Sequence, residues 1–399
     1  MRKYKLLQTV DIPFDVTILI IIGMIASLAG VMLFPVSAGI LPYYENGLYG
    51  LLLFISALQM VTIGKTPFGD MRRTKPLLTA GVIIAAIGII TCFIPDIFST
   101  LPRMLLSICF GLGGFILLVQ MIFSKDKLRS WLIYGGIFRP LIFACGFIYV
   151  LSISIGVLIL KKDLLTTQKT ATMILVYGIT VIYLALVLRK IHLAYPETGN
   201  LNDTAGMSTD KAMILLTGIF MVLLGILLIP VSFGLLPFSG SAQLGLLMII
   251  FAIQMLAFGN TPIGPFPRSW LMIVLGLVFA SLGITSCIIP EILVYPLTIL
   301  VGVLNIIGGT IMLLGICHTV RQRTRKTRGP TPPILVKLTL AQLVLNTVSI
   351  LFGVSMLIAH LIPGGIIGVI LSANGCILLY LLHILNLLDR LKMETNTAG

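Results

Sequence analysis

Twelve runs of about twenty apolar residues follow one another along the chain, separated by short segments that hold most of the charges. A helix of that length crosses the hydrocarbon core of a bilayer, where the backbone must satisfy its hydrogen bonds internally. Only 10% of the residues are charged, against about 25% in soluble domains. We therefore predict an all-α polytopic membrane protein with spans near 16–34, 47–64, 77–95, 102–123, 141–160, 172–189, 212–229, 243–259, 270–289, 296–317, 338–361 and 365–388.

The basic residues predict how the chain is oriented. With twelve spans, 23 of the 27 Lys and Arg residues lie on the side of the two termini, and four lie on the other side. The net formal charge is then +14 on one face and zero on the other. By the positive-inside rule both termini are cytoplasmic, in an inner or plasma membrane. The excess of basic residues thus indicates topology, and no nucleic-acid partner is expected.

The two halves of the chain are copies of each other. Shifting the sequence by 195 residues aligns residues 30–69 with 225–264, with 19 identities in 40 positions and no gap. Shared hydrophobicity alone would not keep Pro, Gly and Gln in register, so the pattern indicates an internal duplication. We predict two parallel six-helix repeats, at 1–192 and 210–399, joined by a polar cytoplasmic linker at 193–209. Parallel repeats are related by an axis along the membrane normal.

A shorter repeat lies within each half. Residues 50–60 match residues 111–121 at several Gly, Phe, Gln and Met positions, and a proline precedes each segment at comparable spacing. This spacing predicts an elementary unit of about sixty residues, a helical hairpin that runs to a proline and returns. Each half is then three such hairpins.

The repeat unit resembles the short membrane repeat of the HdeD-like proteins, the domain-of-unknown-function 308 family, which is linked to acid stress. The residues that carry the resemblance are Gly30, Phe34-Pro35-Val36-Ser37, Gly50-Leu51-Leu52, Ser56, Gly81, Gly88, Pro95, Gly111 and Gly114. The resemblance implies two fused six-helix units and a role in the envelope or in stress response. It implies no chemical mechanism, because these residues are glycines, prolines and aliphatics.

Buried amides are the candidate ligand-path residues. Such side chains either bond between helices or coordinate a polar ligand, and the sequence leaves both interpretations open. Three asparagines that lie deep in spans occur only in the second half, an asymmetry that hints at a ligand path. The candidates are Asn305, Asn346, Asn374, Gln59, Gln120 and Gln254.

Ionisable residues are missing from the middle of the spans. Such residues mark proton relays and ion pathways. Asp15 and Asp210 each open a helix, where an N-terminal carboxylate stabilises the helix dipole. No metal-ligand spacing, catalytic constellation or phosphate loop is present, so we expect no metal, no cofactor and no enzymatic activity.

A basic run follows the tenth span. It could bind anionic lipid, although such runs more often only anchor the orientation of a helix. Its members are Arg321, Arg323, Arg325, Lys326 and Arg328.

Two functions remain open. The first is a non-enzymatic HdeD-like envelope protein of unknown molecular activity. The alternative is a secondary transporter or facilitator for a neutral or apolar solute, because six plus six spans with cytoplasmic termini match a major-facilitator-like layout.

Overall fold

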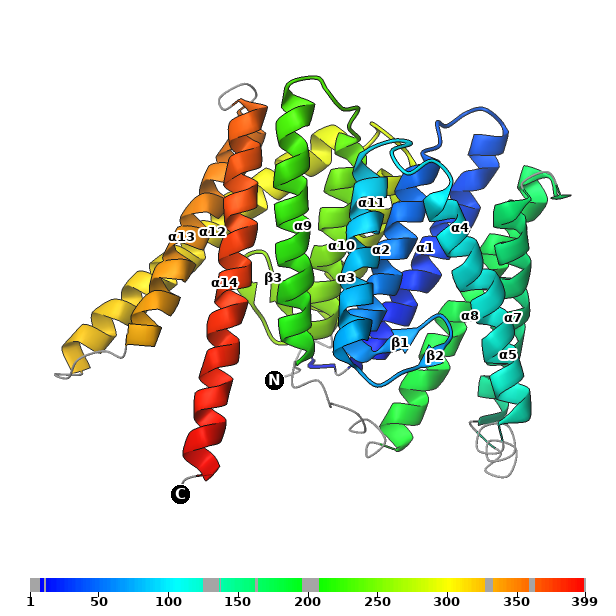
Figure 1. The fold of residues 1–399 in the computed structure, drawn as a ribbon, viewed down its shortest axis with the longest axis horizontal. Helices are drawn as coiled ribbons and strands as arrows, with labels where there is room; N and C mark the ends of the chain where they lie inside the picture. The colour runs from blue at the N-terminus through cyan, green and yellow to red at the C-terminus, as the bar shows by residue number, and fades with distance from the viewer. Residues whose placement is uncertain are drawn as a thin grey trace. The chain divides into compact units, whose positions relative to one another are not determined.

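The computed structural model describes residues 8–10, 12–124, 136, 138–161, 164–195, 208–326, 333–358 and 363–397. Twelve helical segments in these residues are long and apolar enough to cross a membrane, so the predicted spans are confirmed (Figure 1). In the first half they are α1 (Phe14–Ser37), α2 (Glu45–Ile63), α3 (Lys75–Phe93), the composite of α4 (Leu101–Ser107), η2 (Ile108–Leu112) and α5 (Gly113–Phe123), α7 (Phe138–Leu160) and α8 (Thr167–Ala194).

The second half repeats this series. Its six spans are α9 (Thr209–Ser232), α10 (Gly240–Phe258), α11 (Trp270–Ile288), α12 (Val294–Lys326), α13 (Pro333–Leu357) and α14 (Gly364–Thr397). The chain is thus a multi-pass, all-α membrane protein.

Backbone conformation repeats with the sequence. Gly64 and Gly259 end α2 and α10 in the left-handed region, at φ 71° and 70°. Each is followed by a two-residue antiparallel ladder, β1 (Lys65–Thr66) with β2 (Gly69–Asp70) and β3 (Asn260–Thr261) with β4 (Gly264–Pro265). A Thr-Pro-x-Gly turn closes each ladder, and in each turn the threonine hydroxyl donates to the carbonyl of the glycine three residues on.

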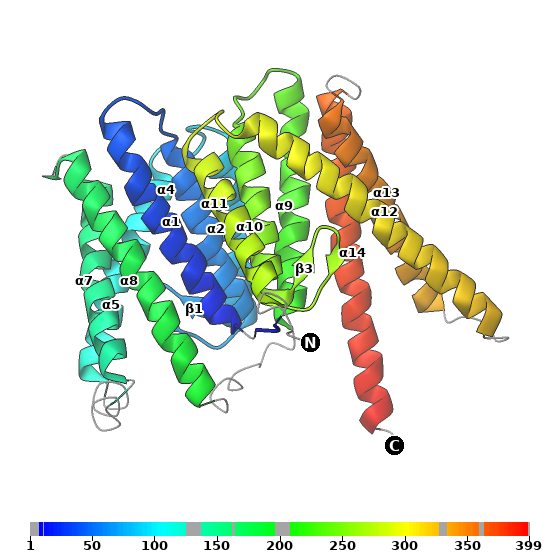
Figure 2. The ribbon, with the colours of Figure 1, turned by 180° about the vertical axis from the view of Figure 1, so that it is seen from behind.

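Helices pack most closely in three pairs per half, held by glycines. In the first half these are the first span with the sixth, the second with the third and the fourth with the fifth. A Cβ added to Gly178 of α8 would lie 2.7 Å from the Gly23 carbonyl oxygen of α1, and one added to Gly88 of α3 would lie 2.8 Å from that of Gly50. Figures 1 and 2 show α2 beside α3 and α1 beside α8.

The second half uses the same contacts. A Cβ on Gly368 of α14 would lie 2.7 Å from the carbonyl oxygen of Gly225 in α9, which aligns with Gly30. A Cβ added to Gly283 of α11 would lie 2.6 Å from the Gly245 carbonyl oxygen of α10. One added to Gly353 of α13 would lie 2.6 Å from the Gly302 carbonyl oxygen of α12. Small residues let helix backbones meet in lipid, where burial of apolar surface gives little driving force.

The chain forms two compact units that do not follow its halves. Unit 1 comprises Met1–Ser208, Ser239–Gly259 and Pro267–Val294, so it includes the α10–α11 hairpin of the second half. Unit 2 comprises Thr209–Phe238, Asn260–Phe266 and Tyr295–Gly399. The repeat boundaries at 1–192 and 210–399 stay a prediction about the sequence. The two units differ from these repeats, because unit 1 takes the α10–α11 hairpin from the second half.

Within unit 1, the hairpins α2–α3 and α10–α11 contact each other reciprocally. The Tyr44 amide donates to the Ile288 carbonyl, and the Ser239 amide donates to the Phe93 carbonyl, both at 2.9 Å. The two bonds are equivalent in the duplication, because Tyr44 aligns with Ser239 and Phe93 aligns with Ile288 under the 195-residue shift. Such a reciprocal pair is expected for a local twofold axis.

Two equivalent cysteines meet at the same contact. The Cys92 and Cys287 thiols both reach the Ala242 carbonyl oxygen, at 3.9 and 3.6 Å. Both side chains are fully buried.

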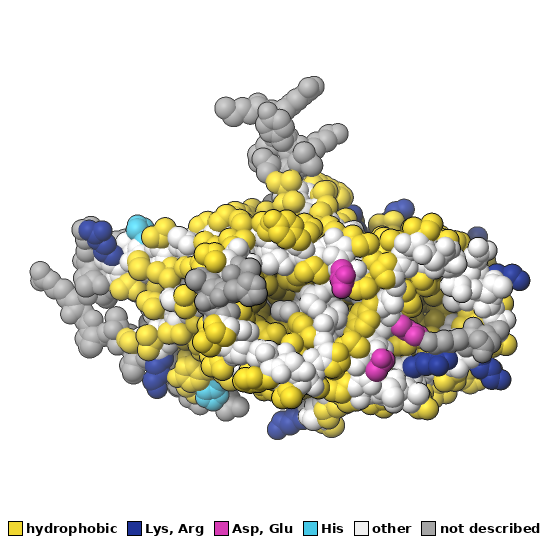
Figure 3. Space-filling view, turned by 90° about the horizontal axis from the view of Figure 1, so that it is seen from above, with side chains coloured by type: hydrophobic (Ala, Val, Ile, Leu, Met, Phe, Trp, Pro, Cys, Tyr) yellow, Lys and Arg dark blue, Asp and Glu magenta, His cyan; other side chains and the backbone are white. Residues whose placement is uncertain are grey.

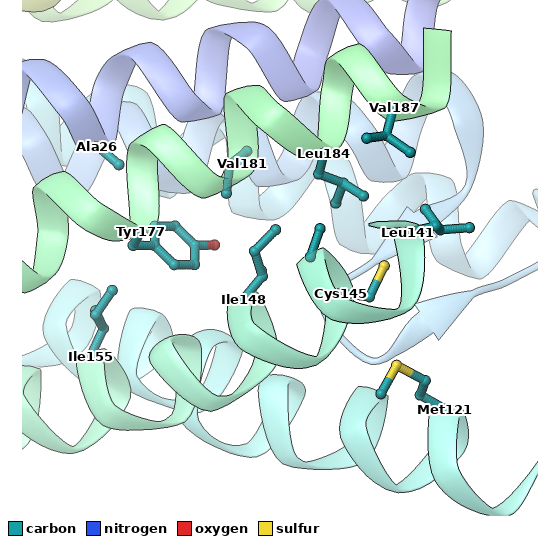
Figure 4. Close-up of a cluster of buried hydrophobic side chains, with 11 residues drawn as sticks. Ala26, Met121, Leu141, Cys145, Ile148, Ile155, Tyr177, Val181, Leu184 and Val187 are labelled. Atoms are coloured by element: carbon teal, nitrogen blue, oxygen red, sulfur yellow. The ribbon is translucent and has the colours of Figure 1, made fainter. Parts of the chain in front are cut away.

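Unit 1 also contains a cluster of buried hydrophobic side chains, most of them from α7 and α8, with Ala26 of α1 and Met121 of α5. Figure 4 shows Tyr177 and Val181 of α8 facing Ile148 and Ile155 of α7. On the outer side of α7, Phe143 is 78% exposed, as expected for a side chain that contacts lipid.

Gly88→Leu should destabilise the protein. The new side chain would meet backbone atoms of α2, the Gly50 carbonyl oxygen and the Phe54 nitrogen, both 2.8 Å from the first added carbon. Overpacking of this kind costs about 1–3 kcal/mol or more. The measurement is the apparent Tm of the detergent-purified protein.

Gly315→Leu is the matched control, because a Cβ added to Gly315 of α12 would have no other part of the described residues within 4 Å, apart from its own helix backbone. Its Tm should stay at the wild-type value. An equal loss in both variants would contradict the assigned α2–α3 contact.

Cys92 and Cys287 should be linked by Hg(II). The test uses a chain in which the other four cysteines are replaced by alanine and a protease site is inserted in the 193–209 segment. After cleavage, treated protein should run as one species in denaturing gels without thiols, and untreated protein as two halves.

Cys92→Ala should abolish the link. Separation of the halves after treatment of the two-cysteine chain would contradict the reciprocal hairpin contact.

Candidate functional site

The three candidate glutamines lie on half-buried faces of their helices. Gln120 of α5 donates its amide hydrogen to the Phe68 carbonyl at 3.1 Å, which ties α5 to the β1–β2 turn. Gln59 of α2 lines a cavity described below. Gln254 lies at the position of α10 that corresponds to Gln59.

The three candidate asparagines lie on three helices of unit 2. The Asn305 amide donates to the Val301 carbonyl of its own helix at 2.8 Å, and its oxygen accepts from the Ser349 hydroxyl of α13 at 2.9 Å. Asn346 donates to the Gln342 carbonyl of its own helix at 2.7 Å. Asn374 is 8% exposed, and its side-chain oxygen has no partner among the described residues. The structure thus shows Asn305 as an interhelical contact.

Two cavities of about 350 Å³ each lie in unit 1, at opposite ends of the same helices. The Glu45 cavity is lined by the start of α2 and of α8 and by the ends of α1 and α7. The Gln59 cavity is lined by the end of α2, the β1–β2 turn, the start of α7 and the end of α8. Viewed from the end at which α1 meets α2, the surface carries many hydrophobic side chains and a few acidic ones (Figure 3).

Among the described residues, four line both cavities, and we call these four the partition. Ile22, Leu52, Phe110 and Tyr177 line both of them. The Phe110 and Tyr177 rings meet edge to face, with centroids 5.9 Å apart. Because aromatic rings turn on few bonds and prefer this geometry, they form a compact apolar barrier.

Phe110 belongs to η2, a single turn of π-helix inside the fourth span. Such turns are rare and are frequent at functional sites, because the extra residue redirects the side chains around it. The π-turn therefore places the ring of Phe110 at the partition.

The asparagines of the second half occupy the positions of aromatic residues in the first half. Asn305 aligns with Phe110 under the 195-residue shift. Asn374 precedes Gly375 in α14, and Gly375 packs against Gly218 and Val222 of α9. The residues of α1 that align with these two are Gly23 and Ser27, and Gly178 of α8 packs against them. Asn374 is therefore the counterpart of Tyr177, which precedes Gly178.

Asn346 is the counterpart of Tyr149. A Cβ added to Gly309 would lie 2.9 Å from the Asn346 carbonyl oxygen, and one added to the equivalent Gly114 would lie 3.1 Å from the Tyr149 carbonyl oxygen. Phe110, Tyr149 and Tyr177 all line the Gln59 cavity. The predicted ligand-path asparagines thus fall at the positions that line a cavity in the other half, while the ligand path itself stays a prediction.

The polar end of the Glu45 cavity is a carboxylate with two tyrosines. The Tyr49 hydroxyl, one helical turn along α2, donates to the Glu45 carboxylate. Tyr43 lines the same end, and burial, with a smaller effect of the nearby Glu45 charge, raises the pKa of its hydroxyl above the usual range. Tyr43 therefore stays protonated and can donate a hydrogen bond.

Lys65 and Asp70, which pair across the β1–β2 ladder, line the Gln59 cavity. Asp15, in the first turn of α1, lies 3.6 Å from the Lys65 ammonium and 3.8 Å from the imidazole of His192 on α8. It also accepts a bond from the Val16 amide at 2.9 Å. Asp15 therefore lies where predicted, in the first turn, and in addition contacts two other segments.

Sequence reasoning missed Glu45, Tyr49, Phe110 and Tyr177. One signal was available, because the aligned copy carries Gly240, Leu244 and Asn305 at the first three of these positions. A difference between copies marks a residue that the common scaffold does not require.

The predicted anionic-lipid site lies at the end of α12, which continues to Lys326. Arg321 is exposed, and Arg328 lies outside the described residues.

Comparisons with protein-family models, with curated proteins and with solved structures found no match to this chain.

Asn305→Leu should destabilise the protein by about 1 kcal/mol, because it removes an interhelical hydrogen bond that is worth roughly 0.6–1 kcal/mol in membrane proteins. Ser349→Ala removes the other partner, so the double variant should lose little more than either single one. Denaturation of the four proteins measures the coupling. Additive losses would contradict the Asn305–Ser349 bond.

Proposed function

We propose that the protein is a membrane facilitator whose solute path runs through unit 1, from the Glu45 cavity to the Gln59 cavity. The observation that carries this proposal is the partition, because four of the described side chains line both cavities. Each cavity is as large as a small-molecule site, for which about 300–1,000 Å³ is typical. A gated path requires two cavities that lie one after the other, with a closed barrier between them. The Glu45 and Gln59 cavities, at opposite ends of α1, α2, α7 and α8, fit this requirement.

The lining of the partition supports a solute without charge at that point. Ile22, Leu52 and Phe110 are apolar, and Tyr177 contributes one hydroxyl. Hydrophobic constrictions close a path by excluding water and open when their side chains move apart. A neutral or apolar solute can cross such a barrier without a fixed counter-charge.

The predicted orientation would place the Gln59 cavity at the cytoplasmic face of an inner or plasma membrane. The basic residues Lys65, Arg72 and Arg73 lie at that end of α2 and α3 and support this placement. The HdeD-like resemblance would give such a protein a role in envelope stress. Non-enzymatic action fits both proposals.

Replacing both rings of the partition by alanine should raise solute flux. In proteoliposomes, Phe110→Ala with Tyr177→Ala should increase glycerol permeability several-fold, because the barrier loses two aromatic rings. Stopped-flow light scattering after an osmotic step measures the swelling rate.

Phe143→Ala is the control, since this ring lies on the outer side of α7 and should leave the rate unchanged. Thermal unfolding of each variant checks that the fold is kept. Wild-type permeability of the folded double variant to glycerol, urea and short alcohols would contradict the path and favour the envelope role alone.

A further inference from the structure

We propose that Arg189 and Trp270 bind the phosphate group of an anionic phospholipid at the surface of unit 1. The ligand class is a phosphodiester that carries a net negative charge and two acyl chains. Neither residue lines the Glu45 cavity or the Gln59 cavity, so the proposal is independent of the solute path.

The Arg189 guanidinium and the Trp270 ring form a cation–π pair, with the Cζ atom 5.6 Å from the ring centroid. Arg189 lies near the end of α8, and Trp270 is the first residue of α11. Helix α1 packs against both of these helices and lies between them in Figure 2. Tryptophan rings are enriched at the level of the lipid head groups. The pair therefore brings a positive charge to a ring that suits this level.

The positive charge of Arg189 has no acidic partner among the described residues. Its Nε–H is buried and has no acceptor in the same part of the chain. Asp15, in the first turn of α1, contacts Lys65 and His192 instead. A buried donor without an acceptor costs free energy. A phosphate accepts two hydrogen bonds from one edge of a guanidinium, so it would supply both the acceptor and the opposite charge.

Two apolar stripes run from this pair toward the middle of the membrane. Leu186 and Ile179 lie on the same face of α8 as Arg189, three and ten residues before it. Val274 and Val278 lie four and eight residues after Trp270, on the same face of α11. All four side chains are about half exposed. Acyl chains would cover these stripes below a bound phosphate, whereas a free phosphate ion would not, so the arrangement favours a lipid.

The predicted orientation supports an anionic lipid. It would place the end of α8 and the start of α11 at the cytoplasmic face. Anionic lipids of the cytoplasmic leaflet attract basic residues near the membrane surface. A zwitterionic lipid brings its own positive charge and would leave that of Arg189 uncompensated.

The duplication shows that the scaffold does not require this pair. Trp270 aligns with Lys75, at which α3 begins, under the 195-residue shift. In the register that pairs Gly178 with Gly375, Arg189 corresponds to Asn386 of α14. The same helices therefore form without the ring and without the guanidinium.

Quenching of tryptophan fluorescence by brominated lipids tests the proposal. The chain has two tryptophans, so Trp131→Phe leaves Trp270 as the single reporter. This full-length protein is reconstituted in dioleoylphosphatidylcholine with increasing fractions of either dibrominated phosphatidylglycerol or dibrominated phosphatidylcholine. We expect half-maximal quenching at an about fivefold lower fraction of the anionic lipid, because one basic residue near the surface contributes about 1 kcal/mol.

Arg189→Gln should remove the preference, so that both brominated lipids quench Trp270 equally. Arg189→Lys keeps the charge but loses the planar fork, and its preference should be intermediate. Lys75→Gln is the matched control, because it removes one exposed positive charge at the start of α3. It should keep the full preference. Quenching by the zwitterionic lipid checks that Trp270 still contacts lipid in each variant.

Three results would overturn the proposal. They are equal quenching of the reference protein by both lipids, an unchanged preference in Arg189→Gln, and an equal loss of preference in Lys75→Gln. Millimolar inorganic phosphate should leave the preference unchanged. Its loss under phosphate would assign the site to the free ion and overturn the lipid assignment.

The glycerol flux measurement is a separate test. Raised flux in the double alanine variant without a lipid preference at Trp270 would leave the path and remove the lipid site. A lipid preference with unchanged flux would do the reverse.

Discussion

Close approach of helix backbones at glycine is the constraint on which the rest of this structure depends. In lipid, apolar side chains gain little by leaving the solvent, so helices associate through packing and interhelical hydrogen bonds. Gly50 with Gly88 and Gly245 with Gly283 bring backbones together where a Cβ would lie under 3 Å from a carbonyl oxygen. Three such pairs in each half decide which helices lie side by side, and thereby which surfaces remain for cavities.

Duplication gave the chain two copies of this scaffold, and the copies carry different side chains. Positions held by glycine in one copy are mostly glycine in the other, whereas three aromatic positions of the Gln59 cavity differ. Phe110, Tyr149 and Tyr177 line the Gln59 cavity, and their counterparts are Asn305, Asn346 and Asn374. One architecture can therefore hold an apolar partition in the first half and amides in the second.

Much of the fold could be predicted from the sequence. The twelve spans, the duplication and the turns after α2 and α10 follow from run length, register and the Thr-Pro-x-Gly pattern. The helix pairs could not be predicted, because glycines occur on many faces and spacing does not show which face meets which partner. The α10–α11 hairpin belongs to unit 1 together with the first half of the chain. This grouping depends on tertiary contacts, which no local sequence pattern indicates.

The site was only partly predictable for the same reason. Gln59 does line a cavity, and Asn305 contacts Ser349 as an interhelical bond. Glu45 seemed to belong to a connecting segment, yet it is the first residue of α2 and lines a cavity. Its importance depends on α1, α7 and α8, which are distant in sequence.

Sidedness of access to the two cavities tests the central claim most directly. In a cysteine-free chain in oriented vesicles, single cysteines would be placed at Thr170 of the Glu45 cavity, Gln59 of the other cavity and Phe143 on the outer side of α7. The reagent is a charged thiol label that does not cross membranes. The account predicts labelling of position 170 from one side only, of position 59 from the opposite side only, and none at position 143. Labelling of positions 170 and 59 from the same side, or of neither, would contradict two cavities separated by a closed partition.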